Sequence, residues 1–418
     1  MAMELLRRLT QGFRAAKPDP GPQWRTPTVL DRGSLGEACL ALDGQGHGTA
    51  LWENAGSLWT MPIGPHSAPA LVRRPLGEGT SPRIELNPDG RGIALWLAEA
   101  AGERQVLGRI LGGVESSTQV VFRTVGVVKH LQGAVDRRGN ALVVWLLEVD
   151  GRTEVMAQAF DTRGSAWEQA PTTLGSSSAP AVAPRMAVNH REHAMVLWEV
   201  EDGRSEGLVA SHYWPSDGIW SDRPVPVVAQ ATHHHQVVMD DLGNALAVWV
   251  HAPYGQRSRL EASFYDGTRS EWGKPETLCS AQSFSALRLA MSGDGEALAA
   301  WCQGEGHGPA RLFTRAFRKG GWDAGSECLE LGHGPVQDLA LALGAEGQAG
   351  LLATHRGPQG DWVSARLRQR EWSEPFQLLP ASRLLCSAPR LCLCAHGASA
   401  LWIQGEGREH SLILAEAF

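Results

Sequence analysis

The sequence predicts an all-β protein that folds as a single eight-bladed β-propeller. Three observations lead to this prediction: a segment ending in Trp recurs along the chain, successive copies lie 44 to 53 residues apart, and the two chain ends complete one another. That spacing is typical of a four-stranded propeller blade. With 43% hydrophobic and 20% charged residues, the 418-residue chain has the composition of a soluble globular protein, which argues against disorder.

The repeated segment consists of a turn and a nearly continuous apolar run. GNALVVW ends at Trp145 and GNALAVW ends at Trp249, each six residues after a turn glycine. Ala353 replaces the Trp of the seventh copy, and the eighth copy, which ends at Trp402, is one residue shorter. Because such runs suit buried strands, each copy predicts the second strand of one blade. The eight turn positions are held by Gly46, Gly90, Gly139, Glu192, Gly243, Gly295, Gly347 and Gly397.

The fifth copy shows the other three strands of a blade. Residues 236–240 alternate between apolar and polar, residues 245–250 form the apolar run, and residues 259–266 alternate again. The copy closes on EWGKPETL, in which Pro275 follows Trp272 by three residues. A Trp followed three or four residues later by Pro recurs in other copies. It marks the fourth strand, since an outermost strand can spare the backbone donor that Pro lacks.

The two chain ends share one blade. The last copy ends with LILAEAF, after its third strand, whereas the start of the chain carries Trp24 and Pro27 in the fourth-strand pattern. We therefore expect residues 22–31 to supply the fourth strand of the blade begun at 388–418. Exchange of a strand between the termini closes the ring and removes open sheet edges. The predicted propeller spans residues 22–418.

Residues 1–21 predict a short amphipathic helix followed by a Pro/Gly linker. Leu5, Leu9 and Phe13 recur at helical spacing opposite Arg7 and Arg14. The helix either packs under the propeller or frays, and any association with a membrane would use this segment. It lacks the apolar run of a signal peptide, so we expect a cytoplasmic location. Seven cysteines without C-x-x-C spacing also suit a reducing compartment.

The repeat V-x-x-D-x-x-G-N-A-x-A-V-W…G-x-W-x-x-P resembles the degenerate, WD40-like propeller repeats of many bacterial proteins. The resemblance covers residues 22–418 and implies the fold, but no particular activity. Quinone dehydrogenases with eight blades place Trp four residues after the turn Gly, whereas in this chain the distance is six. Sialidase Asp-boxes match only at Ser292, Asp294 and Gly295, because Trp301 lies too far along the chain. The functional residues of these two families cannot be transferred.

Most of the 16 Trp residues serve the repeat. Thirteen fall at two fixed positions, where a large flat side chain fills the gap between neighbouring blades. Trp59, Trp214 and Trp362 are irregular and could instead form a platform for a ligand such as a sugar.

The innermost strand carries the main predicted binding site. Seven positions before the turn position, every even-numbered copy has Arg, at Arg83, Arg185, Arg288 and Arg390, and two odd-numbered copies have Gln, at Gln132 and Gln236. Four guanidinium groups at one mouth of the central channel would favour a carboxylate or phosphate ligand. Alternatively, each Arg bonds carbonyls or carboxylates of the adjacent blade and has a structural role.

Three histidines form a weaker cluster near the same mouth. His234 and His235 precede the innermost strand of the fifth copy, and His130 holds the corresponding place in the third copy. They are weak candidates for a metal site, which would need further ligands; surface or packing roles are the alternative.

These patterns favour a non-enzymatic binding or assembly scaffold. We expect no cofactor, because no nucleotide-binding loop, nucleophile elbow or zinc-protease motif is present. The expected partner is an acidic protein segment or, failing that, a small anion, and the net charge of −7 argues against nucleic acid. Two alternatives stay open: a lectin-like, carbohydrate-binding propeller that uses the irregular Trp residues and loops, and a propeller enzyme with an unrecognised cofactor site.

Overall fold

A computed structural model describes most of the chain. The described residues are 23–64, 72–112, 117–177, 182–201, 206–215, 218–305, 310–331, 334–344, 347–395 and 397–417. The predicted helix and linker at residues 1–21 lie outside them. The described residues form eight antiparallel sheets, which we number as blades 1 to 8.

Four blades contain four strands each, ordered below from the innermost strand outwards. Blade 1 is β2 (Leu35–Leu42), β3 (Gly48–Asn54), β4 (Ser57–Ile63) and β5 (Arg74–Glu78); blade 2 is β6 (Thr80–Leu86), β7 (Gly92–Ala100), β8 (Glu103–Leu111) and β9 (Gln119–Thr124). Blade 7 is β30 (Val336–Leu343), β31 (Ala349–Gly357), β32 (Gly360–Arg368) and β33 (Phe376–Ser382); blade 8 is β34 (Leu385–Cys394), β35 (Gly397–Glu406), β36 (Glu409–Ala417) and β1 (Thr28–Gly33).

The other four blades contain a fifth, very short strand beside the outer one. Blade 3 is β10 (Val127–Val135), β11 (Ala141–Val149), β12 (Arg152–Asp161), β13 (Ala166–Trp167) and β14 (Thr172–Ser177); blade 4 is β15 (Val182–Val188), β16 (Ala194–Glu201), β17 (Glu206–Trp214), β18 (Ile219–Trp220) and β19 (Val225–Val228). Blade 5 is β20 (His233–Met239), β21 (Ala245–His251), β22 (Ser258–Asp266), β23 (Glu271–Trp272) and β24 (Glu276–Ala281); blade 6 is β25 (Ser283–Met291), β26 (Ala297–Gly304), β27 (Arg311–Arg318), β28 (Gly321–Trp322) and β29 (Glu327–Leu329).

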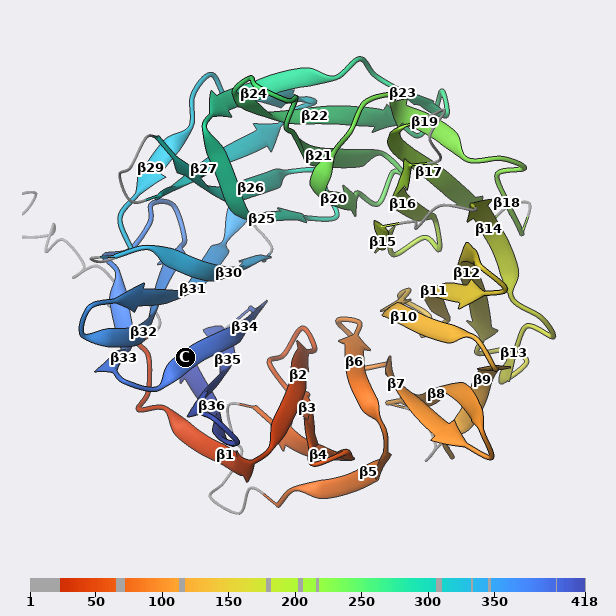
Figure 1. Ribbon diagram of the computed structural model, residues 1–418, viewed down its shortest axis with the longest axis horizontal. Coiled ribbons are helices and arrows are strands. Elements are labelled where there is room, and N and C mark those ends of the chain that lie inside the picture. The colour runs from red at the N-terminus through yellow and green to blue at the C-terminus, as the bar shows by residue number, and fades with distance from the viewer. Residues whose placement is uncertain are drawn as a thin grey trace, which may run out of the picture.

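The blades form a ring around one axis, and their first strands lie nearest its centre (Figure 1). The predicted strand exchange is also present, since β1 from the start of the chain pairs antiparallel with β36 from its end, with Thr28 opposite Leu414. The all-β, eight-bladed propeller closed by both termini is therefore confirmed.

The fourth-strand marker needs a correction. Trp272 does not lie on the outer strand but on the two-residue strand β23, where it pairs with Tyr265 at the end of β22. The outer strand β24 begins directly after Pro275 and pairs with the first half of β22. Because Pro lacks the N–H that a strand needs, it separates the two pieces. In blade 8 the same place is taken by an isolated bridge between Trp24 and Ala417.

The core lies between neighbouring blades. Trp145 of β11, for example, is fully buried in a cluster with Ile93 and Leu95 of β7. The equivalent Trp residues of the other blades are also at most 3% exposed: Trp52, Trp96, Trp198, Trp249, Trp301 and Trp402. Burial of this kind supports the packing role predicted for the regular Trp residues.

The turns between the first and second strands also connect the blades. Asp136 accepts hydrogen bonds from the backbone N–H of Asn140, at 2.8 Å, and from its side-chain amide, at 2.8 Å. Gly139 has a φ of 89°, which its missing side chain allows. Asn87 of the preceding blade donates to the Asp136 carbonyl at 2.8 Å. The Asp or Asn at this position therefore both shapes its own turn and holds a neighbour.

Candidate functional site

Each innermost strand contains a β-bulge just before the predicted ring position. In β6 the pairing with β7 shifts between Thr80 and Arg83, and five other innermost strands shift at the equivalent point. The shifts in β2, between Leu35 and Ala38, and in β30, between Val336 and Asp338, lie slightly earlier. The bulge places Ser81 in the left-handed region, with a φ of 54°. The same conformation recurs at His130, His234, Ala286 and Ala388. A bulge re-aims the side chains that follow it, so these bulges set where the ring residues point.

The predicted Arg and Gln residues share one structural position. Arg83 lies opposite Leu95, Arg185 opposite Leu197, and the remaining members opposite the corresponding residues before the buried Trp. We call Arg83, Arg185, Arg288 and Arg390 the Arg ring. Its members lie within range of one another's charge, since Arg288 and Arg83 both help to lower the pKa of Arg185 after the larger effect of burial.

Two members of the Arg ring are paired with a carboxylate of the preceding or following blade. Arg83 forms an ion pair with Glu37 of blade 1 and donates from Nε to the carbonyl of Leu131 in blade 3, at 3.0 Å. Arg288 forms an ion pair with Asp338 of blade 7, with Nη2 and Oδ1 2.6 Å apart. Both pairs cross a blade interface, and blades 2 and 6 are opposite in a ring of eight. The structural alternative therefore describes these two arginines.

Two further residues at this position are engaged with the backbone. Gln132 donates its amide to the carbonyl of Pro184 and accepts the backbone N–H of Met186 at 3.2 Å, which joins blade 3 to blade 4. Arg390 donates from Nη1 to the carbonyl of Pro389 at 3.2 Å. Gln236 is half-buried and, within the described residues, has no hydrogen bond.

Arg185 differs from the other three arginines. Its side chain is accessible to water although the protein atoms around this concave position partly desolvate it, and within the described part of the chain it has neither a hydrogen bond nor an ion pair. Arg185 lies in blade 4, His130 in blade 3 and His234 in blade 5. Both histidines are also accessible to water. Burial and then the charge of Arg185 lower the pKa of His130, so this imidazole lies close enough to the guanidinium for its charge to act on it. The result is a positive, water-accessible point on the inner strands.

Glu85 adds a carboxyl group to the Arg-lined inner face at blade 2. It lies two residues after Arg83 on β6, and burial raises its pKa to about 7, with Arg83 acting against the shift. The side chain is accessible to water although many protein atoms surround it, as expected at a concave position. Protonation of Glu85 near neutral pH removes a negative charge next to the Arg ring.

The three histidines do not assemble a metal site. His235 is buried, with its Nδ1 3.0 Å from Oε1 of Glu199 in blade 4. His130 and His234 lie on different innermost strands, on either side of blade 4. Among the residues that the structure describes, no group of three or more His, Cys, Asp or Glu side chains is placed to hold a metal ion.

The three irregular Trp rings are occupied by neighbours within the chain. The guanidinium of Arg73 lies 4.3 Å from the ring centre of Trp59. His212 approaches Trp214 with 4.0 Å between ring centres, and His355 stacks on Trp362 at 4.9 Å with the planes only 4° apart. These contacts explain the three rings as packing elements and weaken their use as sugar platforms.

Sequence reasoning missed Glu37 and Asp338, the carboxylates that neutralise Arg83 and Arg288. Both lie nine positions before their turn position, where His130 and His234 stand in blades 3 and 5. The signal was therefore present in the alignment of the copies. It was missed because the bulges of β2 and β30 include Glu37 and border Asp338, and a bulge breaks the alternation from which neighbours on one face are predicted.

Comparison with known proteins shows the fold and little more. No protein-family model matches the chain, and no curated protein is significantly similar in sequence. The structure is similar to the Dos1 propeller, with a TM-score of 0.51 and 10% identity over 94% of this chain and 95% of that chain. It is also similar to an ulvan lyase from a family of polysaccharide lyases, with a TM-score of 0.51 and 8% identity over 93% and 95%. A protein of unknown function from Dyadobacter fermentans matches at 11% identity over 70% and 94%, with a TM-score of 0.45.

At such identities the similarity defines the class of protein, an eight-bladed β-propeller, and leaves its activity to be argued from the site. No helix among the described residues is long and apolar enough to cross a membrane.

Proposed function

We propose that this protein is a non-enzymatic binding propeller in which Arg185, on the Arg-lined inner face, binds a carboxylate of an acidic segment from a partner protein. The observation that carries the proposal is the contrast within the Arg ring. Arg83 and Arg288 already have carboxylates from adjacent blades, whereas Arg185 has an exposed guanidinium without a partner among the described residues. Guanidinium groups bind carboxylates in bidentate fashion, so Arg185 is ready to accept one.

The surroundings of Arg185 favour an anion over a cation or a neutral group. Arg288 and Arg83 contribute positive charge there, and His130 of blade 3 can add a hydrogen bond. An acidic peptide carries several carboxylates along an extended chain and can therefore contact several of these groups at once. We include a reducing, cytoplasmic setting in the proposal, because all seven cysteines are free.

A fluorescein-labelled hexaglutamate peptide tests the proposal by fluorescence anisotropy. We expect saturable binding that weakens with salt, and a loss of at least about tenfold in affinity for Arg185→Gln. Because the side chain of Arg185 makes no hydrogen bond or ion pair within the described chain, this variant should keep its free energy of unfolding within about 0.5 kcal/mol. Arg191→Gln is the matched control: it removes the same charge from the same blade, in the turn between β15 and β16.

Two results would count against this function. Absence of saturable peptide binding by the unmodified protein, or an equal loss in Arg191→Gln, would show that the Arg ring does not bind acidic segments. Binding of citrate through Arg185 without binding of the peptide would assign the ring to a small anion and overturn the proposed protein partner.

A further inference from the structure

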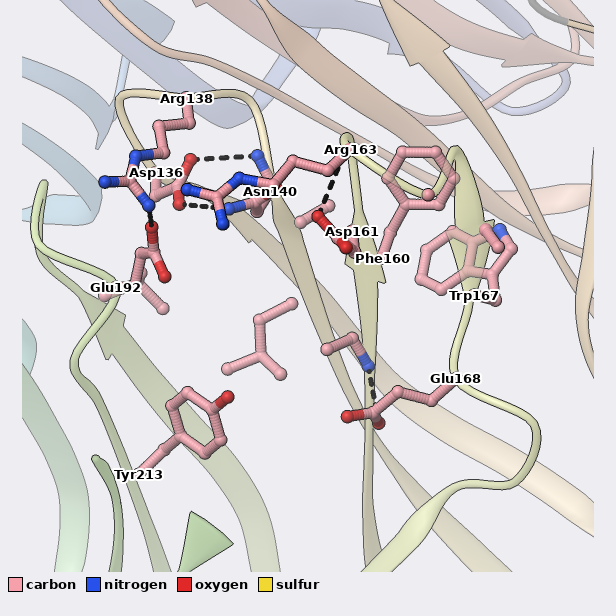
Figure 2. Close-up of a pocket in the computed structure, with 16 residues that line it drawn as sticks. Asp136, Arg138, Asn140, Phe160, Asp161, Arg163, Trp167, Glu168, Glu192 and Tyr213 are labelled. Atoms are coloured by element: carbon pink, nitrogen blue, oxygen red, sulfur yellow. Dashed lines mark hydrogen bonds and ion pairs between the residues drawn. The ribbon is translucent and has the colours of Figure 1, made fainter. Parts of the chain in front are cut away.

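A second site lies away from the Arg ring, in a pocket of about 490 Å³ between blades 3 and 4. Its walls come from Ala159 and Phe160 at the end of β12, Trp167 on β13, and Tyr213 on β17 (Figure 2). The turn between β15 and β16 adds Glu192. The volume falls within the range of about 300 to 1,000 Å³ that is usual for pockets that bind small molecules.

The neighbouring blade interface shows why this pocket exists. Tyr265 in blade 5 is equivalent to Tyr213 in blade 4, because they pair with Ala245 and Ala194 at the same point of the sheet. The hydroxyl of Tyr265 lies 3.0 Å from Nδ1 of His212, which fills the space between blades 4 and 5. The residue of blade 3 that corresponds to His212 is Ala159. A methyl group therefore stands where the next interface has an imidazole.

Replacement of this ring by a methyl group leaves both a space and a polar group without a partner. Within the described residues, the hydroxyl of Tyr213 has no hydrogen bond, although its counterpart in Tyr265 has one. The next interface is closed differently, by stacking of Phe264 on Phe317 with 5.7 Å between ring centres. Among these three consecutive interfaces, the one between blades 3 and 4 is thus hollow and carries a free hydroxyl.

The polar groups around the space offer several acceptors and donors. Glu168 accepts the backbone N–H of Ala159 on Oε2, at 3.1 Å, and its carboxylate points into the same space as the Tyr213 hydroxyl (Figure 2). Glu192 is held by Arg138, with Oε1 and Nη1 2.7 Å apart. Burial, and then the charges of Glu168 and Glu192, raise the pKa of Tyr213, so its hydroxyl stays protonated and can donate at neutral pH.

We propose that this pocket binds a neutral sugar. A sugar supplies hydroxyl donors for the carboxylates and an acceptor for the Tyr213 hydroxyl, while its C–H face suits the apolar wall formed by Ala159, Leu142 and Val188. The carboxylates outnumber the arginines in the lining, which disfavours an anionic ligand. The proposal does not depend on the Arg ring, because the two sites share no residue.

The test is titration of the full-length protein with D-glucose, D-galactose, D-mannose, L-fucose and D-xylose, followed by saturation-transfer NMR and calorimetry. We expect saturable binding of at least one of these sugars. Tyr213→Phe keeps the ring and removes the hydroxyl, so it should weaken binding about threefold to tenfold. Ala159→His should lower affinity at least about tenfold, because it fills this pocket as His212 fills the next one.

Tyr265→Phe is the matched control, since its hydroxyl is already bonded to His212, and it should leave sugar binding unchanged. No saturable binding of any sugar would overturn the proposal, as would equal weakening by Tyr265→Phe. Binding of putrescine but of none of the sugars would also overturn it, because the carboxylates would then serve a cationic ligand. If Ala159→His fails to fold, Tyr213→Phe still decides the question.

Discussion

Buried histidines make the stability of this propeller sensitive to acid. Burial, assisted by the charge of His193, lowers the pKa of His212 to about 4, and burial also lowers the pKa of His355 to about 4. Both side chains are at most 4% exposed, and each is hydrogen-bonded, His212 to Tyr265 and His355 to Ser364. They are therefore neutral in the folded protein under conditions where an unfolded histidine is already charged.

The direction of the resulting pH dependence follows from these two pKa values. Between pH 6.5 and pH 4 the unfolded chain binds more protons than the folded one, so the free energy of unfolding falls as the pH falls through this window. Each histidine contributes at most about 3 kcal/mol to this loss. The raised pKa of Glu85 acts in the opposite direction between pH 4.5 and 7, but the two histidines outweigh this single carboxyl, so we expect the Tm to decline as the pH falls from 6.5 to 4. His355→Gln should be less stable at pH 7 and show a shallower decline, measured by scanning calorimetry. Parallel Tm curves for the two proteins would contradict this assignment.

At the same scale, the sequence could predict where the arginines lie but not which of them are free. Arg83 and Arg185 occupy one position of the repeat, and counting back from the turn places them together. The difference between them depends on Glu37, which lies within the bulge of another blade and therefore escapes a periodic pattern. The sugar pocket is equally local, because it depends on the exchange of one ring for the methyl group of Ala159.

At the scale of elements, the hairpins between the second and third strands of blades 1 to 3 depend on left-handed residues. The two-residue turn between β7 and β8 is Ala101–Gly102, with φ values of 53° and 79°, and the equivalent turn of blade 3 is Asp150–Gly151, with φ values of 49° and 71°. Asp and Asn tolerate this conformation, whereas Ala loses about 1 kcal/mol in it. Ala101 is exposed and so gains nothing from packing.

A pair of exchanges tests this hairpin. We expect Ala101→Asn to raise the free energy of unfolding by about 0.5 to 1 kcal/mol, and Asp150→Ala to lower it by a similar amount, because each changes only the fit of one side chain to a positive φ. Thermal and urea denaturation of the two variants would measure the difference. Changes of the same sign in both variants would show that factors other than backbone conformation govern these turns.

The sequence predicts best the strands that have a long and regular apolar pattern. The second strand of each blade could be found because an apolar run of six or seven residues ends in Trp after a turn, and burial of Trp145 and its equivalents confirms the reason. β23 could not be separated from β24 in the same way, since a two-residue strand has no periodicity. The bulges were also hidden, because the residues that adopt them, such as Ser81 and Ala286, carry no side-chain signal for a positive φ.

At the scale of the whole molecule, non-covalent pairing of β1 with β36 holds the ring closed. Leu30 of β1 is buried in a cluster with Trp52 of blade 1 and Leu414 of blade 8. Its neighbour Asp31 accepts hydrogen bonds from Nε1 of Trp52, at 2.8 Å, and from the side-chain amide of Asn54, at 2.9 Å. Burial alone would raise the pKa of Asp31, but these hydrogen bonds outweigh it and the pKa is lowered. One carboxylate thus joins the first blade to the last.

Asp31→Ala should therefore weaken the closure of the entire ring. The substitution leaves the buried indole N–H of Trp52 and the amide of Asn54 without their acceptor, which costs about 2 to 3 kcal/mol in the free energy of unfolding. Because the ring opens most easily at this seam, hydrogen exchange should accelerate first at the amides of β1 and β36 and later in blades 3 to 6. Asp266→Ala is the control, since Asp266 accepts its hydrogen bonds from Thr268 within one exposed turn, and it should lower the Tm much less. Equal destabilisation by the two variants, or exchange that accelerates uniformly around the ring, would mean that closure at Asp31 does not limit the stability of the propeller.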